Sequence, residues 1–207
     1  MVSGKSRAEK MEETRKRLIS AARKAFAENG YHAASMDELT ANAGLTRGAL
    51  YHNFGDKTGL LAAVVDQIDT AMATKAQEAG RKAGGGWSGL LAEGAAYIKM
   101  ALEPEVQRIV LLDGPAVLGD PSRWPSQNQC LQATISTLNE LVAQGQIKSV
   151  DIEGLARLLN GMALNAALWV ASSDDAHSTL PKAIAAFECL ASGALHTKLA
   201  TPSPQDG

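Results

Sequence analysis

Apolar residues recur along this chain with the spacing of an α-helix. Between Glu12 and Asn29 they fall at positions 18, 19, 22, 25 and 26, which share one face of a helix. No β-type alternation of apolar and polar residues lasts for more than a few positions, so the pattern predicts an all-α protein. Helices are expected at about residues 12–29, 36–43, 47–54, 57–79, 88–102, 104–113, 126–144, 151–171 and 179–199.

Capping and breaking residues mark several of these helix ends. Ser35 and Glu38 have the spacing of a capping box, in which each side chain bonds the other residue's backbone amide, so a helix should begin after Ser35. Gly30 should end the first helix, and Pro181 suits the first turn of the last one. Three successive glycines at 84–86 form the clearest break in the chain.

Length and composition place the chain among globular proteins. It has 207 residues, of which 45% are hydrophobic and 20% charged, which suffices for a core. No apolar run reaches the roughly 18 residues of a membrane span, and the polar N-terminus has no secretory signal pattern. Cys130 and Cys189 have no metal-ligand spacing and are too few to staple the domain. We therefore expect a cytoplasmic protein with no cofactor, no metal and no membrane partner.

The net charge of −2 hides an uneven distribution of charge along the chain. Residues 1–58 hold ten basic and seven acidic side chains, a net charge of +3. The remaining residues hold 10 basic and 15 acidic side chains, a net charge of −5. Such asymmetry is weak evidence by itself, but it indicates an N-terminal part that binds a polyanion and a body that does not.

The N-terminal part has the pattern of a helix-turn-helix. A glycine-containing turn at residues 41–46 separates a short helix from an eight-residue helix at 47–54. Small residues on the second helix allow close approach to base edges, and its arginine can bond guanine or a phosphate. The threonine before it lies at a helix N-terminus, which favours a phosphate. The candidate DNA-binding residues are Thr46, Arg47, Gly48, Ala49, Tyr51, His52, Asn53 and Lys57.

Each of these residues alone has an ordinary structural explanation. Tyr51 could be a half-buried aromatic residue, His52 a surface histidine, and Arg47 a solvated charge. Their joint occurrence on one short helix after a turn is what favours DNA binding.

The same residues carry a specific resemblance. The runs Arg17–Tyr31, Ser35–Leu39, Ala43–Phe54 and Lys57–Leu61 are similar to the DNA-binding region of the tetracycline-repressor (TetR/AcrR) family. The resemblance covers about residues 12–65 and implies an all-helical homodimer that binds a palindromic operator in double-stranded DNA. It also implies a C-terminal domain in which a small-molecule effector binds and releases the DNA. The expected parts are a DNA-binding domain at 1–58, a linking helix at about 57–80, a ligand-binding and dimerisation domain at 59–200, and a disordered tail at 201–207.

The resemblance assigns roles to individual positions. The residues that would face bases are Arg47, Ala49 and His52. Those that would mainly hold the DNA backbone are Thr46, Tyr51, Asn53 and Lys57, with Ser35 at the start of the second helix. Gly59 departs from the family, which often has Glu or a similar residue there, and should slightly weaken the first turn of the fourth helix.

The last two expected helices have wide apolar faces rich in small residues. The resemblance implies that they pack against a second copy to form a four-helix dimer core, and the alternative is an ordinary monomer core. The predicted interface residues are Leu155, Leu159, Met162, Ala166, Phe187, Leu190 and Leu195.

An effector pocket should lie inside the body, between the helices expected at 88–113, 126–144 and 151–171. Candidates are polar-tipped, flat or adaptable side chains on mainly apolar helices, and each is also compatible with a purely structural role. They predict an apolar or aromatic ligand held by a few hydrogen bonds. The candidate ligand-binding residues are Tyr97, Met100, Trp124, Asn128, Asn165 and Trp169.

Two other classes of function compete with this interpretation. An enzyme is disfavoured, because serine, histidine and aspartate occur in no nucleophile-elbow or metal spacing and the glycines at 84–86 follow no strand. The other alternative is a regulator without a small ligand, which would be controlled by a protein partner or act as an architectural DNA binder. Activation in place of repression also stays open, because the position of the operator determines whether the bound regulator raises or lowers transcription.

Overall fold

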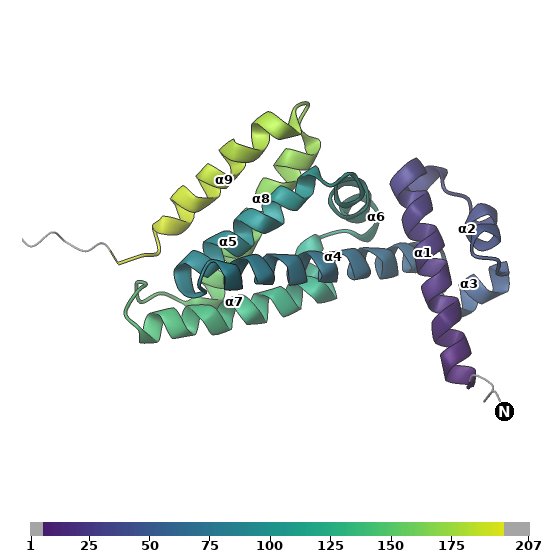
Figure 1. Cartoon of the computed structure of the whole chain (residues 1–207), viewed down its shortest axis with the longest axis horizontal. Helices are drawn as coiled ribbons and strands as arrows, with labels where there is room; N and C mark the ends of the chain where they lie inside the picture. Colours follow the sequence, from purple (N-terminus) through teal and green to yellow (C-terminus); the bar gives the residue numbers. More distant parts are fainter. Residues whose placement is uncertain (1–5, 197–207) are drawn as a thin grey trace, which may run out of the picture.

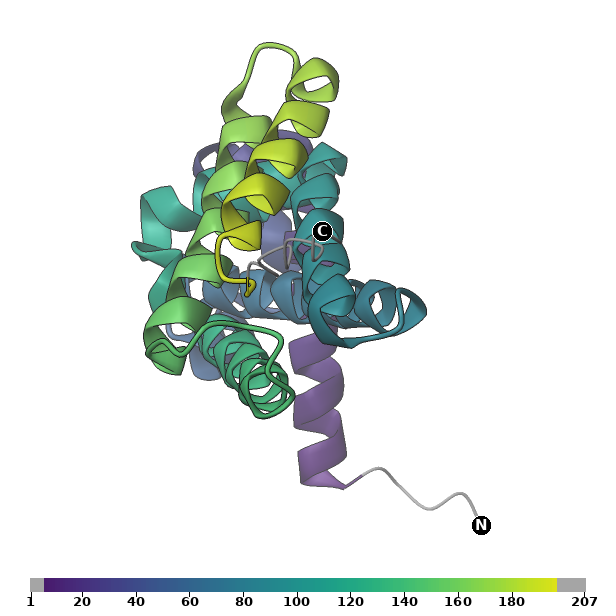
Figure 2. The same ribbon diagram turned by 90° about the vertical axis from the view of Figure 1, so that its left-hand side faces the viewer.

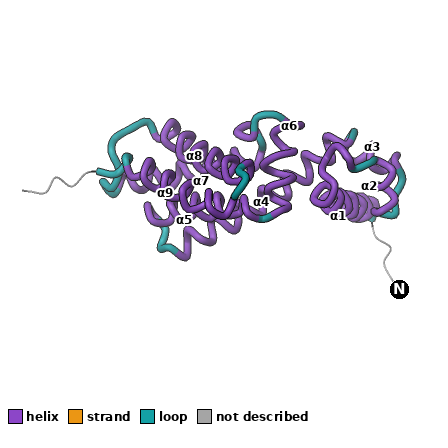
Figure 3. Tube along the Cα trace, turned by 90° about the horizontal axis from the view of Figure 1, so that it is seen from above, coloured by secondary structure: helices purple, strands orange, loops and turns teal. Residues whose placement is uncertain are grey.

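The computed structural model describes residues 6–196, and every regular element in that range is a helix. The all-α prediction is therefore confirmed, as the tube in Figure 3 shows. None of these helices is long and apolar enough to cross a lipid bilayer. The α-helices are α1 (Arg7–Ala33), α2 (Met36–Asn42), α3 (Arg47–Phe54), α4 (Lys57–Lys82), α5 (Gly86–Lys99), α6 (Gly114–Leu118), α7 (Pro125–Ala143), α8 (Ile152–Ser172) and α9 (Ala176–Ser192). A π-helix spans Val106–Asp113, and short 3-10 helices span Met100–Leu102 and Pro121–Arg123.

The helices α1, α2 and α3 form a head at one end of the molecule (Figure 1). Four large side chains from these helices are fully buried between them: Leu18, Phe26, Leu39 and Leu50. The helix starts follow from local chemistry, since Ser35 and Glu38 form the predicted capping box at the start of α2. A core of this kind fixes the three helices relative to one another.

α4 runs from the head into the body and joins the two parts (Figure 1). It buries an apolar stripe that includes Leu60, Val64 and Ile68, and the Asp56 side chain caps its first turn by accepting from the Gly59 amide at 2.7 Å. A side chain at Gly59 would place its Cβ 2.0 Å from the Phe54 carbonyl oxygen. The missing side chain thus does more than weaken the first turn, because it allows the close junction between α3 and α4.

The body consists of α5, α7, α8 and α9 packed around the far part of α4. Figure 2 shows α8 and α9 lying side by side as a hairpin. One end of the body has its own buried cluster, formed by α7, α8, α9 and the loop before α8. That cluster includes Leu138, Leu141, Ile147, Ala156 and Ala191.

Several helix boundaries differ from the predicted ones. Regular helical geometry breaks at Gly30 as expected (φ 78°), but one further turn follows it. The stretch at 114–118, expected to be a loop, forms α6, because Pro115 is compatible with a first helical turn. Pro181 lies inside α9 and not in its first turn, since the helix already begins after Asp175, which caps it. α9 ends at Ser192, and the tail at 201–207 lies outside the described residues.

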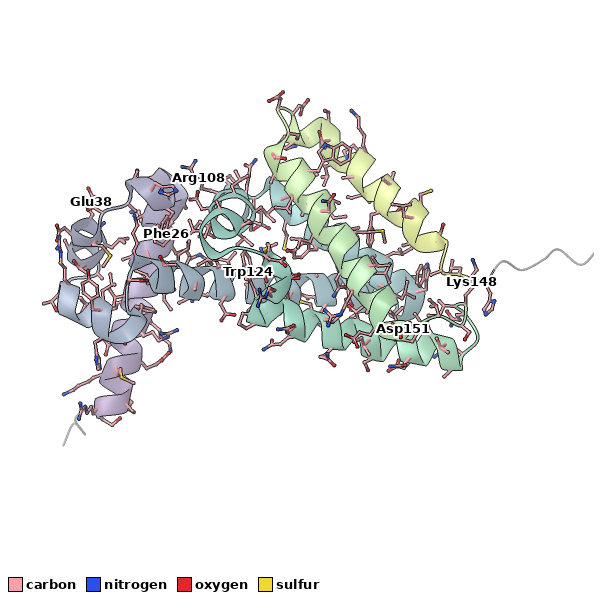
Figure 4. All side chains as sticks on the ribbon, turned by 180° about the vertical axis from the view of Figure 1, so that it is seen from behind. Phe26, Glu38, Arg108, Trp124, Lys148 and Asp151 are labelled. Atoms are coloured by element: carbon pink, nitrogen blue, oxygen red, sulfur yellow. The ribbon has the colours of Figure 1, made fainter. Side chains whose placement is uncertain are left out.

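The head contacts the body through the π-helix as well as through α4. The Arg23 guanidinium donates to both Glu105 carboxylate oxygens, at 2.5 and 2.6 Å, and the Tyr31 amide donates to Asp113 at 2.8 Å. Arg108 lies directly over Gly30, where a Cβ would come within 2.1 Å of its guanidinium (Figure 4). Two polar contacts and the close approach of Arg108 to Gly30 therefore hold α1 against residues 105–113, beside the continuous α4 connection.

Candidate functional site

The turn between α2 and α3 is held by hydrogen bonds to its backbone. Thr46 caps α3 by accepting from the Ala49 amide at 3.2 Å. The Arg17 guanidinium, from α1, donates to the Ala43 carbonyl at 2.5 Å and the Gly44 carbonyl at 3.3 Å. Arg17 was not among the predicted site residues, because nothing local in the sequence shows that α1 crosses the turn at this point.

α3 presents a polar face to solvent. Arg47, Gly48 and His52 are exposed, whereas Leu50 is fully buried in the head. The Tyr51 side chain is 54% exposed, so it does not serve as a half-buried core aromatic. These exposed residues are all among those predicted to contact DNA, whereas three others in that set, Ala49, Asn53 and Lys57, are half-buried.

Arg47 is held by a carboxylate of the preceding helix. Its guanidinium forms a bidentate pair with Asp37 of α2, with an Nε–Oδ1 distance of 2.5 Å. The hydrogen bond from Arg47 lowers the pKa of the Asp37 carboxyl, and the same pair raises the pKa of Arg47. Both side chains are exposed, so solvent screens the pair and leaves Arg47 free to exchange Asp37 for a base or phosphate.

Three more of the predicted DNA-binding residues make internal contacts. The Asn53 side-chain amide donates to the Ala49 carbonyl at 2.7 Å, and the Ser35 hydroxyl belongs to the α2 capping box. The Lys57 ammonium lies 4.4 Å from the centre of the Tyr31 ring, and burial lowers its pKa. A second cation that sequence reasoning missed, Arg15, lies 4.7 Å from the centre of the Phe54 ring.

A second candidate site is a cavity of about 90 Å³ inside the body. It is lined by α5, α7 and α8, as predicted, and also by α4 and α9. Of the six predicted ligand-binding residues, Tyr97 lines it. The side chains that sequence reasoning missed are Gln77, Trp87, Glu93, Gln127, Cys130, Thr134, Asn160 and Phe187.

The other five predicted ligand-binding residues lie elsewhere. Met100 is buried in the main core, and Trp124 packs against Gly114, where a Cβ would lie 2.8 Å from the indole ring (Figure 4). Asn128 and Asn165 are exposed, and Trp169 is 48% exposed on α8. These five residues lie outside the cavity, because the helical period shows which residues share a face but not how far each helix is rotated toward the cavity.

A buried carboxylate lies beside the cavity, on α4. Asp69 accepts from the Ser126 hydroxyl at 2.6 Å and from the Gln127 side-chain amide at 2.9 Å, both at the start of α7. Burial raises the pKa of Asp69, although these two hydrogen bonds oppose the rise. Among the residues at 6–196, no group of three histidine, cysteine or acidic side chains is placed to hold a metal ion.

The outer face of the α8–α9 hairpin carries exposed apolar side chains. Leu158 is 69% exposed and Leu190 is 66% exposed. Two residues predicted for the dimer interface, Leu159 and Phe187, are instead buried within one subunit and line the cavity. They lie on the inner side of the hairpin, whereas Leu158 and Leu190 lie on its outer side.

Comparison with known proteins identifies the family. Residues 18–64 match the family model described as bacterial regulatory proteins, tetR family, and residues 87–194 match the model described as tetracyclin repressor-like, C-terminal domain. The chain belongs to the TetR family. As a TetR-family transcriptional regulator it is a DNA-binding protein and not an enzyme, and its head is the family's helix-turn-helix.

Several relatives of this TetR-family regulator match over most of their length. The Tn10 TetC protein of Escherichia coli is 28% identical over 165 residues, 77% of this chain and 81% of TetC. The transcriptional repressor AcnR of Corynebacterium glutamicum is 29% identical over 148 residues, 70% of this chain and 76% of AcnR.

Solved structures agree with the fold. A TetR-family regulator from Pectobacterium atrosepticum is 47% identical, with a TM-score of 0.84 over 93% of this chain and 99% of that one. RolR, solved with resorcinol, is 22% identical, with a TM-score of 0.64 over 92% of this chain and 99% of that one, and shows the shared fold.

Proposed function

We propose that this TetR-family regulator is a homodimeric repressor that binds a palindromic operator through α3. The observation that carries the proposal is the exposed set of Arg47, Tyr51 and His52 on a capped helix that follows a clamped turn. An arginine that is held in a bidentate pair already has the geometry that guanine requires. The proposed DNA-binding domain comprises residues 1–58, and residues 59–200 form the ligand-binding and dimerisation domain.

The outer face of the α8–α9 hairpin supports a dimer. Leu158, Trp169 and Leu190 are large apolar side chains left exposed on neighbouring helices. A twofold interface there would bury these residues in both subunits. A twofold protein also matches a palindromic operator, and two half-site contacts then act together.

The cavity in the body supports release of the operator by a small molecule. Its wall includes Ala73, Ala76 and Gln77 of α4, the helix that continues to the head. A ligand that favours one position of this helix would change the spacing of the two heads. Ligand and operator must then oppose each other's binding by the same factor.

Replacing Arg47 by alanine should weaken operator binding by about 1–3 kcal/mol and relax the preference at one base position, because the bidentate contact is lost. Quantitative footprinting on the operator and on variants of each base pair would measure both effects. Arg81→Ala is the matched control, since Arg81 is an exposed arginine at the body end of α4 and should change neither.

Tyr51→Phe separates backbone contacts from base readout. Removing one hydroxyl at an exposed position should weaken binding to all sequences evenly. If Arg47→Ala and Tyr51→Phe gave the same small loss on operator and on random DNA, α3 would not be the reading helix. Broad protection of DNA without a discrete palindrome would contradict the repressor itself.

A further inference from the structure

One charged side chain lines the cavity, and it has no partner. Glu93 of α5 is half-buried there, and among the described residues it makes no hydrogen bond or ion pair. The lining contains no lysine, arginine or histidine. Burial raises the pKa of the Glu93 carboxyl, because partial desolvation disfavours its charged form. A desolvated carboxylate of this kind gains most from an arriving positive charge.

Aromatic rings surround the same space. Trp87 and Tyr97 come from α5, and Phe187 comes from α9. Glu93 and Tyr97 are four residues apart on one helix, so their side chains share a face. The Tyr97 hydroxyl is buried in the wall without a hydrogen-bond partner, so a ligand that reached it would satisfy an otherwise unpaired polar group. Ring faces attract cations, because the centre of an aromatic face is electron-rich.

The surroundings add negative potential. Asp69 is buried next to the cavity, and its charge acts with burial to raise the pKa of Tyr97. Burial, reinforced by Asp69 and Glu93, raises the pKa of the Cys130 thiol to about 11. Two carboxylates thus act on side chains of the cavity wall, and no cationic side chain lines it to balance them.

We propose that this pocket binds a small organic cation, an amine or quaternary ammonium that carries one apolar or aromatic group. Its positive nitrogen would contact the Glu93 carboxylate and the Tyr97 hydroxyl oxygen, and its apolar group would lie against Trp87, Leu159 and Phe187. The inference rests on the proposed effector pocket and changes the ligand class expected from the sequence, which was an apolar or aromatic ligand held by a few hydrogen bonds.

The volume limits the size of this cation. The cavity measures about 90 Å³. For comparison, an apolar protein cavity of about 150 Å³ accepts one benzene molecule. The buried part of the ligand is therefore no larger than about one ring, and the rest of a probe such as benzyltrimethylammonium would have to extend through the partly open side of the pocket.

The test uses the full-length protein and four single-ring probes in isothermal titration calorimetry. Benzylamine and benzyltrimethylammonium carry a positive charge, benzyl alcohol is neutral, and benzoate is negative. Both cations should bind at least tenfold more tightly than benzyl alcohol, and benzoate should not bind. Equal or tighter binding of benzyl alcohol would overturn the proposal, as would failure of both cations to bind at millimolar concentration.

Glu93→Gln supplies the decisive variant, because it removes the charge and keeps the shape. It should weaken binding of both cations at least tenfold and change that of benzyl alcohol less than twofold. Glu78→Gln is the matched control, since Glu78 is exposed on α4 and pairs with Lys82 at 3.3 Å outside the cavity. Unchanged cation affinity in a Glu93→Gln protein with native circular dichroism would refute the assignment.

Operator binding distinguishes this inference from the proposed function. A cation that binds the pocket without weakening operator binding would contradict ligand-driven release and leave the ligand class intact. If benzyl alcohol released the operator at a lower concentration than either cation, ligand-driven release would be supported and the cationic ligand class would be contradicted.

Discussion

Replacing both Leu158 and Leu190 by glutamate is expected to leave the protein monomeric. Each leucine is about two-thirds exposed in one subunit, at 69% and 66%, and a twofold interface would bury four such side chains. At ~1–2 kcal/mol for burying the exposed two-thirds of each leucine, their loss should raise the dimer dissociation constant by at least about 10³-fold. Sedimentation velocity at micromolar concentration would measure the change.

The same double variant should lose most of its operator affinity, because single heads bind half-sites independently. Val142→Glu is the control, since Val142 is an exposed apolar residue on α7 away from the hairpin face. It should remain dimeric and bind the operator normally. A double variant that stays dimeric would show that the subunits associate through another surface.

Truncating Phe26 to alanine should have the largest effect on folding stability. Phe26 is the largest fully buried side chain of the head, and its ring lies 5.7 Å from that of Tyr31. The free energy of unfolding should fall by about 3–5 kcal/mol, because the head is too small to close the resulting cavity. Urea unfolding at fixed protein concentration, followed by circular dichroism, would measure this loss.

Met11→Ala provides the comparison on the same helix. Met11 is exposed, so its truncation should change the free energy of unfolding by no more than about 0.5 kcal/mol. A loss below about 1 kcal/mol for Phe26→Ala would mean that the head core can repack.

The elements that could be predicted from the sequence are those set by local chemistry. Ser35 and Glu38 form a capping box at the start of α2, and Thr46 and Asp56 cap α3 and α4. Each of these hydrogen bonds joins residues three positions apart in the sequence. Their contributions do not depend on the rest of the fold, so the head was predicted almost completely. The exposed face of α3 followed from the same short-range pattern.

The pocket could not be predicted in the same way. Its lining depends on the rotation of five helices that meet far apart in the sequence, and Glu93 and Phe187 meet there only in the folded chain. Trp124 and Trp169 have the composition of pocket residues, yet one packs beside Gly114 and the other faces outward. The bond from Arg17 to the turn was missed for the same reason, because it crosses 26 residues.

The length of α4 has a mechanical consequence. From Gln77 at the cavity to Lys57 at the head, the helix extends about 30 Å at ~1.5 Å per residue. A tilt of about 6° at the cavity would move the far end by about 3 Å, nearly the ~3.4 Å rise of one base pair. In a dimer the two displacements add, which puts the heads out of phase with the operator by more than one step. In the proposed dimer, a small rotation of α4 would therefore be enough for an effector to change the fit between the two heads and the operator.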